Sequence, residues 1–507
     1  MLATSGLIAF LTLFVFFVAL GFFASRWRKG DLSDLGEWAL AGKRMGTYLV
    51  WFLVGADLYT AYTFIAIPSG VYGKGAIYNF AVPYVALTFG IAMLFMPRFW
   101  RIAREKGYIT GADFAKGTFN SSTLAIMIAV VGIVAELPYI ALQIVGMQAV
   151  LNTMLAGVSD VATVSEISLI IAFIVLAAFT YTSGLRGATL TAVLKDILIF
   201  GGIIAVIVAL AVSGGLHSGF TVKPAYSTLA PALQNAYWSI FIVSALGLYL
   251  YPHAINGVLS GQDAEKVRKS TSLLPIYGMG LALLALYGVA IYGNSGALAF
   301  VKTHGGSGLL VVPSLIQSVL PSWAAGIAFL GIFIGGLVPA AIMAISQANL
   351  LTRNIVKEFK PNLSAADETR IAKWSSVAFK FLALAFVFVV NSTYAVQLQL
   401  FGTILIVQTL PSIFGGLITR RLNKYGLIIG LIAGEVLGVF LMADANKFGT
   451  WSTSFFSTPP FGALYVGATA LALNMIIVVL LTLVARPKAE VHSEEIGTLK
   501  ATERAPN

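Results

Sequence analysis

The sequence predicts an all-α polytopic membrane protein, and three observations support this prediction. Hydrophobic residues make up 58% of the 507 residues, charged residues make up only 10%, and the mean hydropathy is +0.88. Long apolar stretches recur along the chain, and lysine and arginine gather in every second connection between them. A chain of this composition has too little polar surface to coat a water-soluble particle. We therefore expect lipid to surround most of it.

Thirteen stretches are long enough to be transmembrane helices, because about 20 apolar residues cross the roughly 30 Å of hydrocarbon in a bilayer. The first has no preceding basic region and no small-residue cleavage site, so we expect a retained helix and not a cleaved signal. The predicted spans are 5–25, 46–70, 76–97, 123–153, 164–183, 187–213, 234–260, 272–297, 323–352, 373–391, 394–418, 424–443 and 461–485. They form one transmembrane domain over residues 1–485, and segment 486–507 is expected to be a disordered cytoplasmic tail.

The basic residues predict the orientation of the chain, because cytoplasmic connections collect lysine and arginine. With the N-terminus outside, the inner segments hold 26 of the 32 basic residues and the outer connections hold four. The other two, Lys195 and Lys380, lie within spans. We therefore expect a cell-membrane protein with its N-terminus outside and its C-terminus in the cytoplasm.

The composition argues against several other classes of protein. The basic residues behind the net charge of +11 are scattered over short connections without interleaved aromatic residues, which is not typical of a nucleic-acid-binding surface. The chain has no cysteine, and only His253 of its four histidines lies within a span, so we expect no disulfide, metal centre or cofactor. It also lacks an ATP-binding glycine loop and a nucleophile–base pair, so we do not expect an enzyme.

Two predicted spans carry polar residues and helix breakers near mid-membrane. The second span contains Asp57 among hydroxyl-bearing residues, and the seventh contains Pro252, His253 and Asn256. A charge at the bilayer centre costs about 2.5–3.5 kcal/mol even on the mildest scale, so such residues usually have a function. Five spans separate the two interruptions, which is typical of an inverted repeat formed by spans 2–6 and 7–11. Alternatively, the glycine and proline residues only permit kinks and tight packing.

Several segments resemble the solute:sodium symporter family, whose members have the LeuT fold. They are GEWALAGKRMG, REKGYITGADFAKGTF, LPYIALQIVGMQAVL and YPHAINGVLSGQDAEKVRKS, and the resemblance extends over essentially all 13 spans. Within the family, GADLYTAYTFIAIPSGVYGKG, TAVLKDILIF, SLLPIYGMGLALLALYGVAIYG and QLQLFGTILIVQTLP are most similar to the bacterial and archaeal monocarboxylate permease branch. Members of that branch take up lactate, pyruvate and related short acids.

The resemblance implies a substrate cavity at the two interrupted spans. His253 falls where sugar-transporting members place a gating aromatic residue, and Tyr251 lies one step toward the pocket. The candidate substrate-binding residues are Tyr59, Tyr62, Thr63, Tyr139, Gln143, Tyr251 and His253. Each tyrosine can instead be a core aromatic residue with its hydroxyl bonded to backbone, and His253 can be a buried histidine with satisfied hydrogen bonds. The positive N-terminal ends of half-helices suit a carboxylate substrate.

The resemblance also implies an ion site, from which this sequence departs. Asp57 matches a polar position on the first core helix, Asp196 matches an acidic residue near the family's second sodium site, and the carbonyls of Gly55 and Leu58 match backbone ligands of that site. Sodium-coupled members add adjacent hydroxyl side chains on the eighth core helix. The corresponding positions here are Pro339, Ala340 and Ala341, and segment 323–345 contains no serine or threonine. Hard oxygen ligands are therefore missing, and we expect a degenerate sodium site.

Lys195 provides a replacement for the missing cation, because it lies beside Asp196 on the fifth core helix. Its ammonium group can supply the positive charge that sodium would bring, as an amine on this helix does in some sodium-independent LeuT-fold transporters. The alternative is that Lys195 snorkels or forms a static pair with Asp196.

Together these observations predict a LeuT-fold secondary transporter that imports a short monocarboxylate by alternating access, coupled to protons in preference to sodium. The expected partners are a small organic anion, H⁺ and the lipid bilayer, and no nucleic acid. A sodium-coupled symporter of another small organic solute is the main alternative. A membrane sensor domain is a further one, against which the short tail argues.

Overall fold

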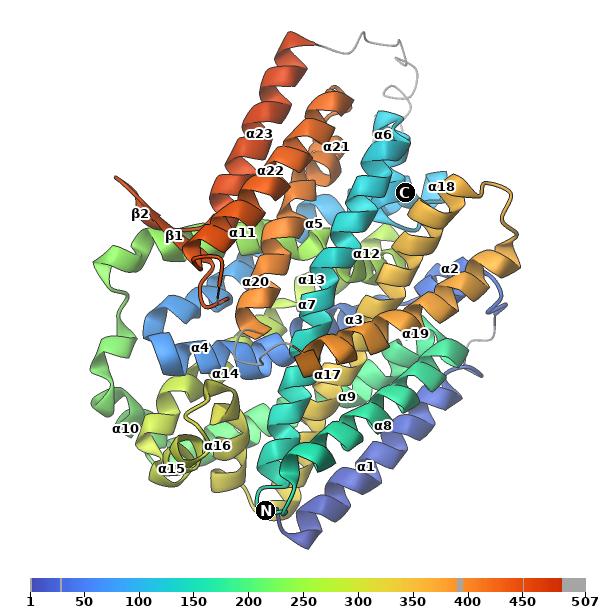
Figure 1. Cartoon of the computed structure of the whole chain (residues 1–507). Helices are drawn as coiled ribbons and strands as arrows, with labels where there is room; N and C mark the ends of the chain where they lie inside the picture. The colour runs from blue at the N-terminus through green and yellow to red at the C-terminus, as the bar shows by residue number, and fades with distance from the viewer. Residues whose placement is uncertain (1, 28–29, 390–394, 450, 486–507) are drawn as a thin grey trace, which may run out of the picture.

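The computed structural model describes residues 2–27, 30–389, 395–449 and 451–485 of a predominantly helical chain (Figure 1). The elements are α1 (Thr4–Phe23), α2 (Leu35–Leu40), α3 (Thr47–Leu58), α4 (Ile67–Lys74), α5 (Ala81–Lys106), α6 (Gly111–Phe119), α7 (Ser122–Met154), α8 (Val161–Ser183), α9 (Leu185–Val212), α10 (Gly215–Val222), α11 (Gln234–Gly247), α12 (Pro252–Leu259), α13 (Ala264–Leu273), α14 (Pro275–Ala290), α15 (Ser295–Thr303), α16 (Val311–Val319), α17 (Ser322–Leu350), α18 (Lys357–Phe359), α19 (Ala365–Val389), α20 (Ala395–Ile406), α21 (Gly416–Ile418), α22 (Lys424–Ala445), β1 (Phe455–Thr458), β2 (Gly462–Tyr465) and α23 (Val466–Val484). The predicted tail, 486–507, lies outside the described residues.

Twelve helices among the described residues are long and apolar enough to cross a membrane, where the sequence predicts thirteen spans. The difference comes from predicted span 46–70, which is divided into α3 and a helical segment that begins at Tyr62. Because α3 has only 12 residues, it does not reach the length of a full span. The sequence predicts an interruption in this span, and the count of thirteen takes the two halves together as one span.

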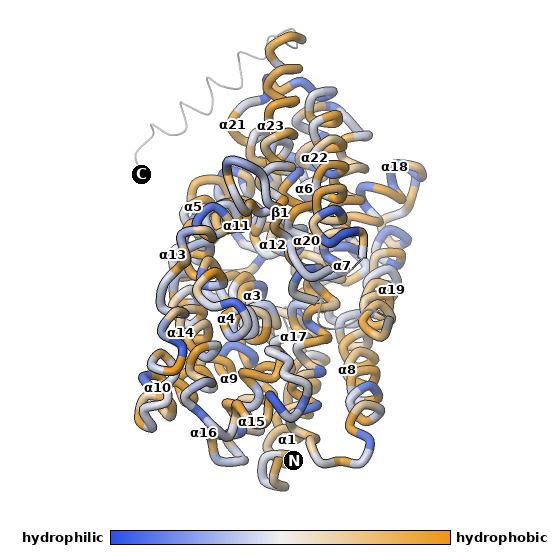
Figure 2. The backbone as a smooth tube through the Cα atoms, turned by 60° about the vertical axis from the view of Figure 1, so that its left-hand side comes forward, coloured by the Kyte–Doolittle hydropathy of each residue, from blue (hydrophilic) through white to orange (hydrophobic). Residues whose placement is uncertain are grey.

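The interior of the bundle is built around α17, which is buried along almost its entire length. It packs against α7, α9, α1 and α19, while α22 and α23 pair with each other. Large apolar side chains are exposed on the outer helices, among them Ile8 and Leu11 of α1 and Ile171 and Ile174 of α8. Figure 2 shows this apolar character along the peripheral helices. These surfaces suit contact with lipid and not with water.

Two helices of the bundle are broken near their middles. Helix α3 ends at Leu58, and a π-helical turn starts at Tyr62 before α4. Helix α11 is followed by a 3₁₀ turn, and Tyr251 has an extended backbone before Pro252 opens α12. Proline accounts for the second break, because it disfavours a helical conformation in the residue before it. The first break depends on a contact from another helix, described below.

The two broken helices begin equivalent five-helix halves of the chain. One half contains α3 with α4, then α5, α7, α8 and α9, and the other contains α11 with α12, then α14, α17, α19 and α20. The halves meet where Met45, before α3, exchanges backbone hydrogen bonds with the segment after α12: its N–H donates to Ser260 at 3.0 Å, and its carbonyl accepts from Gln262 at 2.9 Å. This is the five-plus-five arrangement that the spacing of the interruptions predicts.

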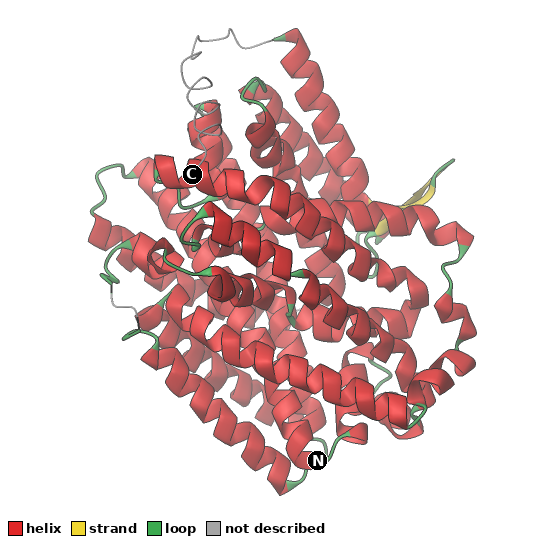
Figure 3. Cartoon of the chain, turned by 180° about the vertical axis from the view of Figure 1, so that it is seen from behind, coloured by secondary structure: helices red, strands yellow, loops and turns green. Residues whose placement is uncertain are grey.

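The two ends of the bundle differ in their short elements. Figure 1 shows α6, α18 and α21 at the end where α23 finishes, and α10, α15 and α16 at the opposite end. The antiparallel strands β1 and β2, which pair Phe455 with Tyr465, lie between α22 and α23 in sequence and project from the side of the bundle (Figure 3). The α6 and α18 end carries basic residues of the predicted inner connections, including Lys116 and Lys357.

Candidate functional site

The break after α3 is held open by side chains that satisfy its backbone. Gln143 of α7 accepts a hydrogen bond from the Ala61 N–H at 2.8 Å and donates one to the Tyr139 carbonyl at 3.1 Å. The Thr60 hydroxyl accepts from the Tyr62 N–H at 3.1 Å, and the Thr63 hydroxyl donates to the Leu58 carbonyl. Buried backbone groups need such partners in the membrane. The side chains of Gln143 and Thr63 therefore shape the break itself.

A polar cavity lies beside both breaks. Its walls come from the segment after α3 and from α5, α7, α11 and α20. The Tyr251 hydroxyl lies 3.1 Å from the Thr403 hydroxyl, and the rings of Tyr139 and Tyr251 are 5.6 Å apart. We call it the outer cavity; its lining residues are Tyr62, Tyr84, Tyr139, Ser244, Leu248, Tyr251, Gln399, Leu400 and Thr403.

Three of the predicted substrate-binding residues, Tyr62, Tyr139 and Tyr251, line the outer cavity. Tyr59 does not, because its hydroxyl donates to the Tyr277 carbonyl at 2.9 Å and its ring packs 4.9 Å from the ring of Tyr277. Gln143, Thr63 and His253 are likewise absent from the lining. Their roles as substrate contacts stay predictions, and the structure places their side chains in bonds that support the breaks.

Four polar residues that line the outer cavity were not predicted from the sequence. They are Tyr84 of α5, Ser244 of α11, and Gln399 and Thr403 of α20. A signal was present for α20, since its predicted span reads QLQLFGTILIVQTLP and carries glutamine and threonine residues in an otherwise apolar segment. Polar residues within a span are functional candidates by default.

Lys195 is fully buried beside the first break. Its ammonium nitrogen donates to the carbonyls of Ala56 at 3.2 Å and Tyr59 at 3.0 Å, and it lies 2.8 Å from Oδ1 of Asp196. The Tyr277 hydroxyl donates to Oδ2 of Asp196 at 2.6 Å. The amine therefore binds the carbonyls of the broken helix while Asp196 balances its charge.

The carbonyls that Lys195 contacts each lie one residue after Gly55 and Leu58, whose carbonyls match the family's sodium ligands by resemblance. Both of those carbonyls are already used in this structure: Gly55 accepts from the Tyr59 N–H at 2.9 Å, and Leu58 accepts from the Thr63 hydroxyl. The carbonyls of Ala56 and Tyr59 therefore remain to face the amine.

The degenerate sodium site on α17 stays a prediction. Pro339, Ala340 and Ala341 are buried on this helix, and their side chains carry no oxygen. Ser346 follows on the same helix, but its hydroxyl lies 2.7 Å from the Met343 carbonyl and 2.8 Å from Oε2 of Glu136 of α7. It is thus engaged with another group.

Asp57 lies at the end of α3 and is 3% exposed. Neither of its carboxyl oxygens has a hydrogen-bond partner among the described residues. A buried carboxylate without a partner is costly. Asp57 is therefore a candidate for binding a proton or another cation, as predicted for an ion-coupling residue.

His253, at the start of α12, pairs with Glu136 of α7. The ring Nδ1 lies 2.7 Å from Oε1 of Glu136, and the His253 backbone N–H donates to the same oxygen at 2.9 Å. The N-terminus of α12, proposed from the sequence to attract a carboxylate substrate, is thus already in contact with a carboxylate of the protein itself.

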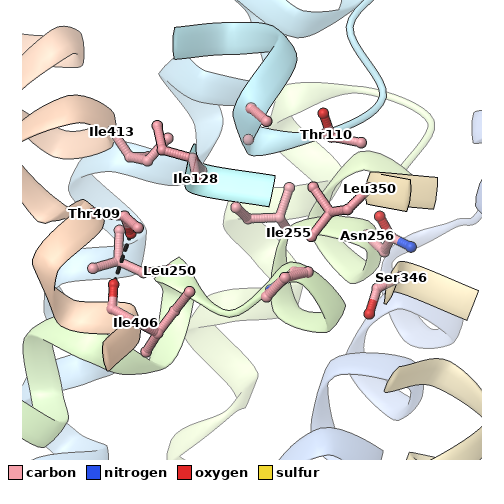
Figure 4. A pocket seen from close by; sticks show the side chains of 13 residues that line it. Thr110, Ile128, Leu250, Ile255, Asn256, Ser346, Leu350, Ile406, Thr409 and Ile413 are labelled. Atoms are coloured by element: carbon pink, nitrogen blue, oxygen red, sulfur yellow. Dashed lines mark hydrogen bonds between the residues drawn. The ribbon is translucent and has the colours of Figure 1, made fainter. Parts of the chain in front are cut away.

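A second cavity lies on the α6 side of the α11–α12 break, and we call it the inner cavity (Figure 4). The start of α6, the first residues of α12 and the later part of α17 contribute to its walls. Figure 4 shows its mainly aliphatic lining, with Asn256 and Ser346 among the few polar side chains. The lining residues are Thr110, Gly111, Ala112, Ile128, Leu250, Pro252, Ile255, Asn256, Ser346, Leu350, Ile406, Thr409 and Ile413.

Comparison with known proteins relates this arrangement to a family of transporters. The sequence model described as the Sodium:solute symporter family matches residues 38–434. A monocarboxylate transport permease protein of Rhizobium johnstonii is 38% identical over 503 residues, covering 96% of this chain and 99% of the relative. The uncharacterized symporter YodF of Bacillus subtilis is 35% identical over 480 residues, covering 92% of this chain and 90% of the relative.

More distant similarities extend to sodium-coupled proteins. A sodium-dependent multivitamin transporter of Oryctolagus cuniculus is 22% identical, covering 90% of this chain and 73% of the relative. A solved structure described as the substrate-bound outward-open state of a Na⁺-coupled sialic acid symporter superposes with a TM-score of 0.76, at 14% identity and covering 96% of this chain and 99% of that one. This likeness shows the fold, the LeuT type with its inverted repeat.

Proposed function

The chain belongs to the sodium:solute symporter family, and we propose that it imports short monocarboxylates, such as lactate or pyruvate, together with protons by alternating access. As a family member it is a multi-span membrane transporter and not an enzyme. The proposal concerns its substrate, its coupling ion and its orientation.

The outer cavity supports a small organic anion as the substrate. Its hydroxyl and amide groups come from Tyr62, Tyr139, Tyr251, Gln399 and Thr403, and all of them can donate hydrogen bonds to a carboxylate. Among the described residues no lysine or arginine lines it, so these neutral donors would orient the acid. The naming of the Rhizobium relative as a monocarboxylate transport permease supports the same class of substrate.

The observation that carries proton coupling is the position of Lys195. Its amine binds the two carbonyls at the broken helix, and α17 brings no hydroxyl oxygen at Pro339, Ala340 or Ala341. A lysine in a low-dielectric site can lose and regain a proton near neutral pH, unlike a fixed charge. Transport becomes coupled when protonation and substrate binding favour the same conformation.

We expect uptake of labelled lactate or pyruvate into proteoliposomes to follow an inward proton gradient. Accumulation should rise as the external pH falls at constant internal pH, and it should not change when sodium replaces potassium on both sides. Acetate, proline and glucose serve as comparison solutes. Uptake that requires sodium at fixed pH would contradict proton coupling and favour the sodium-coupled alternative, for which the unpartnered carboxyl of Asp57 offers oxygen ligands.

The orientation can be tested because the natural chain has no cysteine. We expect a cysteine at Ser457, exposed on β1, to react with an impermeant maleimide added to intact cells. A cysteine at Lys269, exposed on α13, is the matched control and should react only after the cells are permeabilised. The reverse pattern would contradict the orientation predicted from the distribution of basic residues.

A further inference from the structure

Three buried side chains from three helices form a cluster that the proposed transport mechanism does not use. Glu136 comes from α7, His253 from α12 and Ser346 from α17, and their exposed fractions are 0%, 0% and 1%. Oε1 of Glu136 lies 2.7 Å from the His253 ring nitrogen Nδ1, and the Ser346 hydroxyl lies 3.0 Å from Oε1 and 2.8 Å from Oε2. The cluster thus ties the half-helix α12 to α7 and to the central helix α17.

The hydrogen bonds indicate how the protons are arranged. Oε1 of Glu136 accepts from the His253 backbone N–H and lies closest to the ring Nδ1, which suits an ionised carboxylate. The single hydrogen of the Ser346 hydroxyl has two acceptors within reach, the Met343 carbonyl at 2.7 Å and Oε2 of Glu136 at 2.8 Å. The ring Nδ1 of His253 then carries a hydrogen toward Glu136. The other ring nitrogen, Nε2, is buried and has no hydrogen-bond partner among the described residues. It is therefore a position at which one further proton can bind.

Two acidic side chains from other helices act on the His253 imidazole. Glu136 of α7 and Asp57 of α3 both act on the imidazole, while the aromatic rings of Tyr139 and Tyr251 lie 5.6 Å and 5.3 Å from it. Lys195 and Asp196 of α9 act on Asp57 and form their own pair. Asp196 balances the charge of Lys195, so the carboxyl groups of Glu136 and Asp57 act on the single imidazole of His253. Protonation of His253 reduces this buried negative charge.

Ser346 connects the cluster to a cavity. Its hydroxyl bonds Glu136, and the same residue lines the inner cavity together with Thr110 and Asn256 (Figure 4). Thr110 precedes α6 in a connection that the basic residues predict to be cytoplasmic. Lys195 contacts neither cavity lining, because its amine is directed to the carbonyls of Ala56 and Tyr59.

We propose that Glu136 and His253 form a second proton-binding site, separate from Lys195, that exchanges its proton with the inner cavity beside Ser346. Its role in transport rests on the proposed function. The proton binds at Nε2 of His253 and converts the hydrogen bond between a neutral imidazole and the Glu136 carboxylate into an ion pair. Opposite charges attract strongly in a low-dielectric interior. Protonation thus strengthens the bond that holds α12 to α7. Release of the proton to the inner side weakens that bond.

The test uses nitrogen-15 NMR of labelled histidine in the purified full-length protein. His253 is one of four histidines, so replacing His217, His304 and His492 by Gln leaves a single histidine signal. We expect Nδ1 to stay protonated while Nε2 titrates between about pH 5 and 8. In Glu136→Gln the midpoint should fall by about one to three pH units, because the neighbouring negative charge is lost. In Lys195→Met the imidazole should still titrate.

A single neutral or a single charged form of His253 from pH 5 to pH 9 would overturn the proposal, and so would loss of the titration in Lys195→Met. The protein with the three histidine-to-glutamine replacements alone shows whether His253 titrates, so the test does not depend on whether Glu136→Gln folds. Sodium-driven uptake together with a titrating His253 would contradict the proposed function and leave the second site standing. Proton-driven uptake together with a His253 that does not titrate would overturn only the second site.

Discussion

Replacing Lys195 by Met, together with Asp196 by Asn, should abolish pH-driven accumulation of substrate. The steady-state ratio of inner to outer substrate should fall to about one, because a carrier without a coupled proton only equilibrates its substrate. Counterflow exchange of labelled for unlabelled substrate should persist. The second substitution is needed because removal of the amine alone leaves Asp196 as an unpaired buried charge, which costs about 3–5 kcal/mol.

Lys380 provides the matched control for this experiment. It is also fully buried in a membrane helix, α19, but its amine donates hydrogen bonds only to Ser376 among the described residues, and none of these bonds reaches a broken helix. Lys380→Met should therefore keep its pH-driven accumulation. If the double variant accumulates substrate as the wild-type protein does, Lys195 is not the coupling group. Equal loss in both variants would indicate a general effect of removing a buried lysine.

The positions of the two helix breaks could be predicted from the sequence, whereas their detailed register could not. Pro252 disfavours a helix at Tyr251 by its own covalent structure, so the break before α12 is encoded locally. The break after α3 depends on Gln143, which reaches from α7 to the Ala61 N–H. A contact between residues so distant in sequence has no local signature. The carbonyls that face Lys195, those of Ala56 and Tyr59, could therefore not be predicted from the sequence.

The lining of the outer cavity illustrates the same limit. Tyr59 and Tyr62 are neighbours in sequence and equally suited to binding, yet only Tyr62 lines the cavity. The difference follows from the break, after which the backbone turns Tyr59 toward Tyr277. The polar residues of α20, such as Thr403, belong to the other half of the repeat. Their place beside Tyr251 is set by the packing of helices, which apolar periodicity alone does not specify.

Composition and charge, by contrast, were sufficient for the fold class. Hydropathy predicts the spans because lipid admits only backbone that satisfies its own hydrogen bonds. The two breaks show where each half of the repeat begins, because helix breakers and polar residues lie in the first helix of both halves. The described residues contain twelve apolar helices of spanning length and not thirteen, because the break leaves α3 with only 12 residues.

Substrate affinity should fall about ten- to a hundred-fold when Tyr251 is replaced by Ala. Tyr251 lines the outer cavity at the break before α12, and its hydroxyl lies 3.1 Å from that of Thr403. A hydrogen bond to a charged group contributes about 1.5–3 kcal/mol, which corresponds to this range. Tyr251→Phe removes the hydroxyl and keeps the ring. If the hydroxyl binds the carboxylate, the affinity lost in Tyr251→Phe should be most of the affinity lost in Tyr251→Ala. Binding can be measured by isothermal titration calorimetry at fixed pH.

Tyr59→Phe is the matched control, because it removes a hydroxyl that donates to the Tyr277 carbonyl outside the cavity. Its affinity for the substrate should stay close to that of the wild-type protein. A loss in Tyr59→Phe with none in Tyr251→Phe would place the substrate on the other side of the broken α3. Similar losses in both would show that the hydroxyls act on the shape of the break. A loss of affinity confined to the Tyr251 variants assigns the carboxylate to the outer cavity. Tyr59 and Tyr251 carry the same side chain, and only Tyr251 lines that cavity.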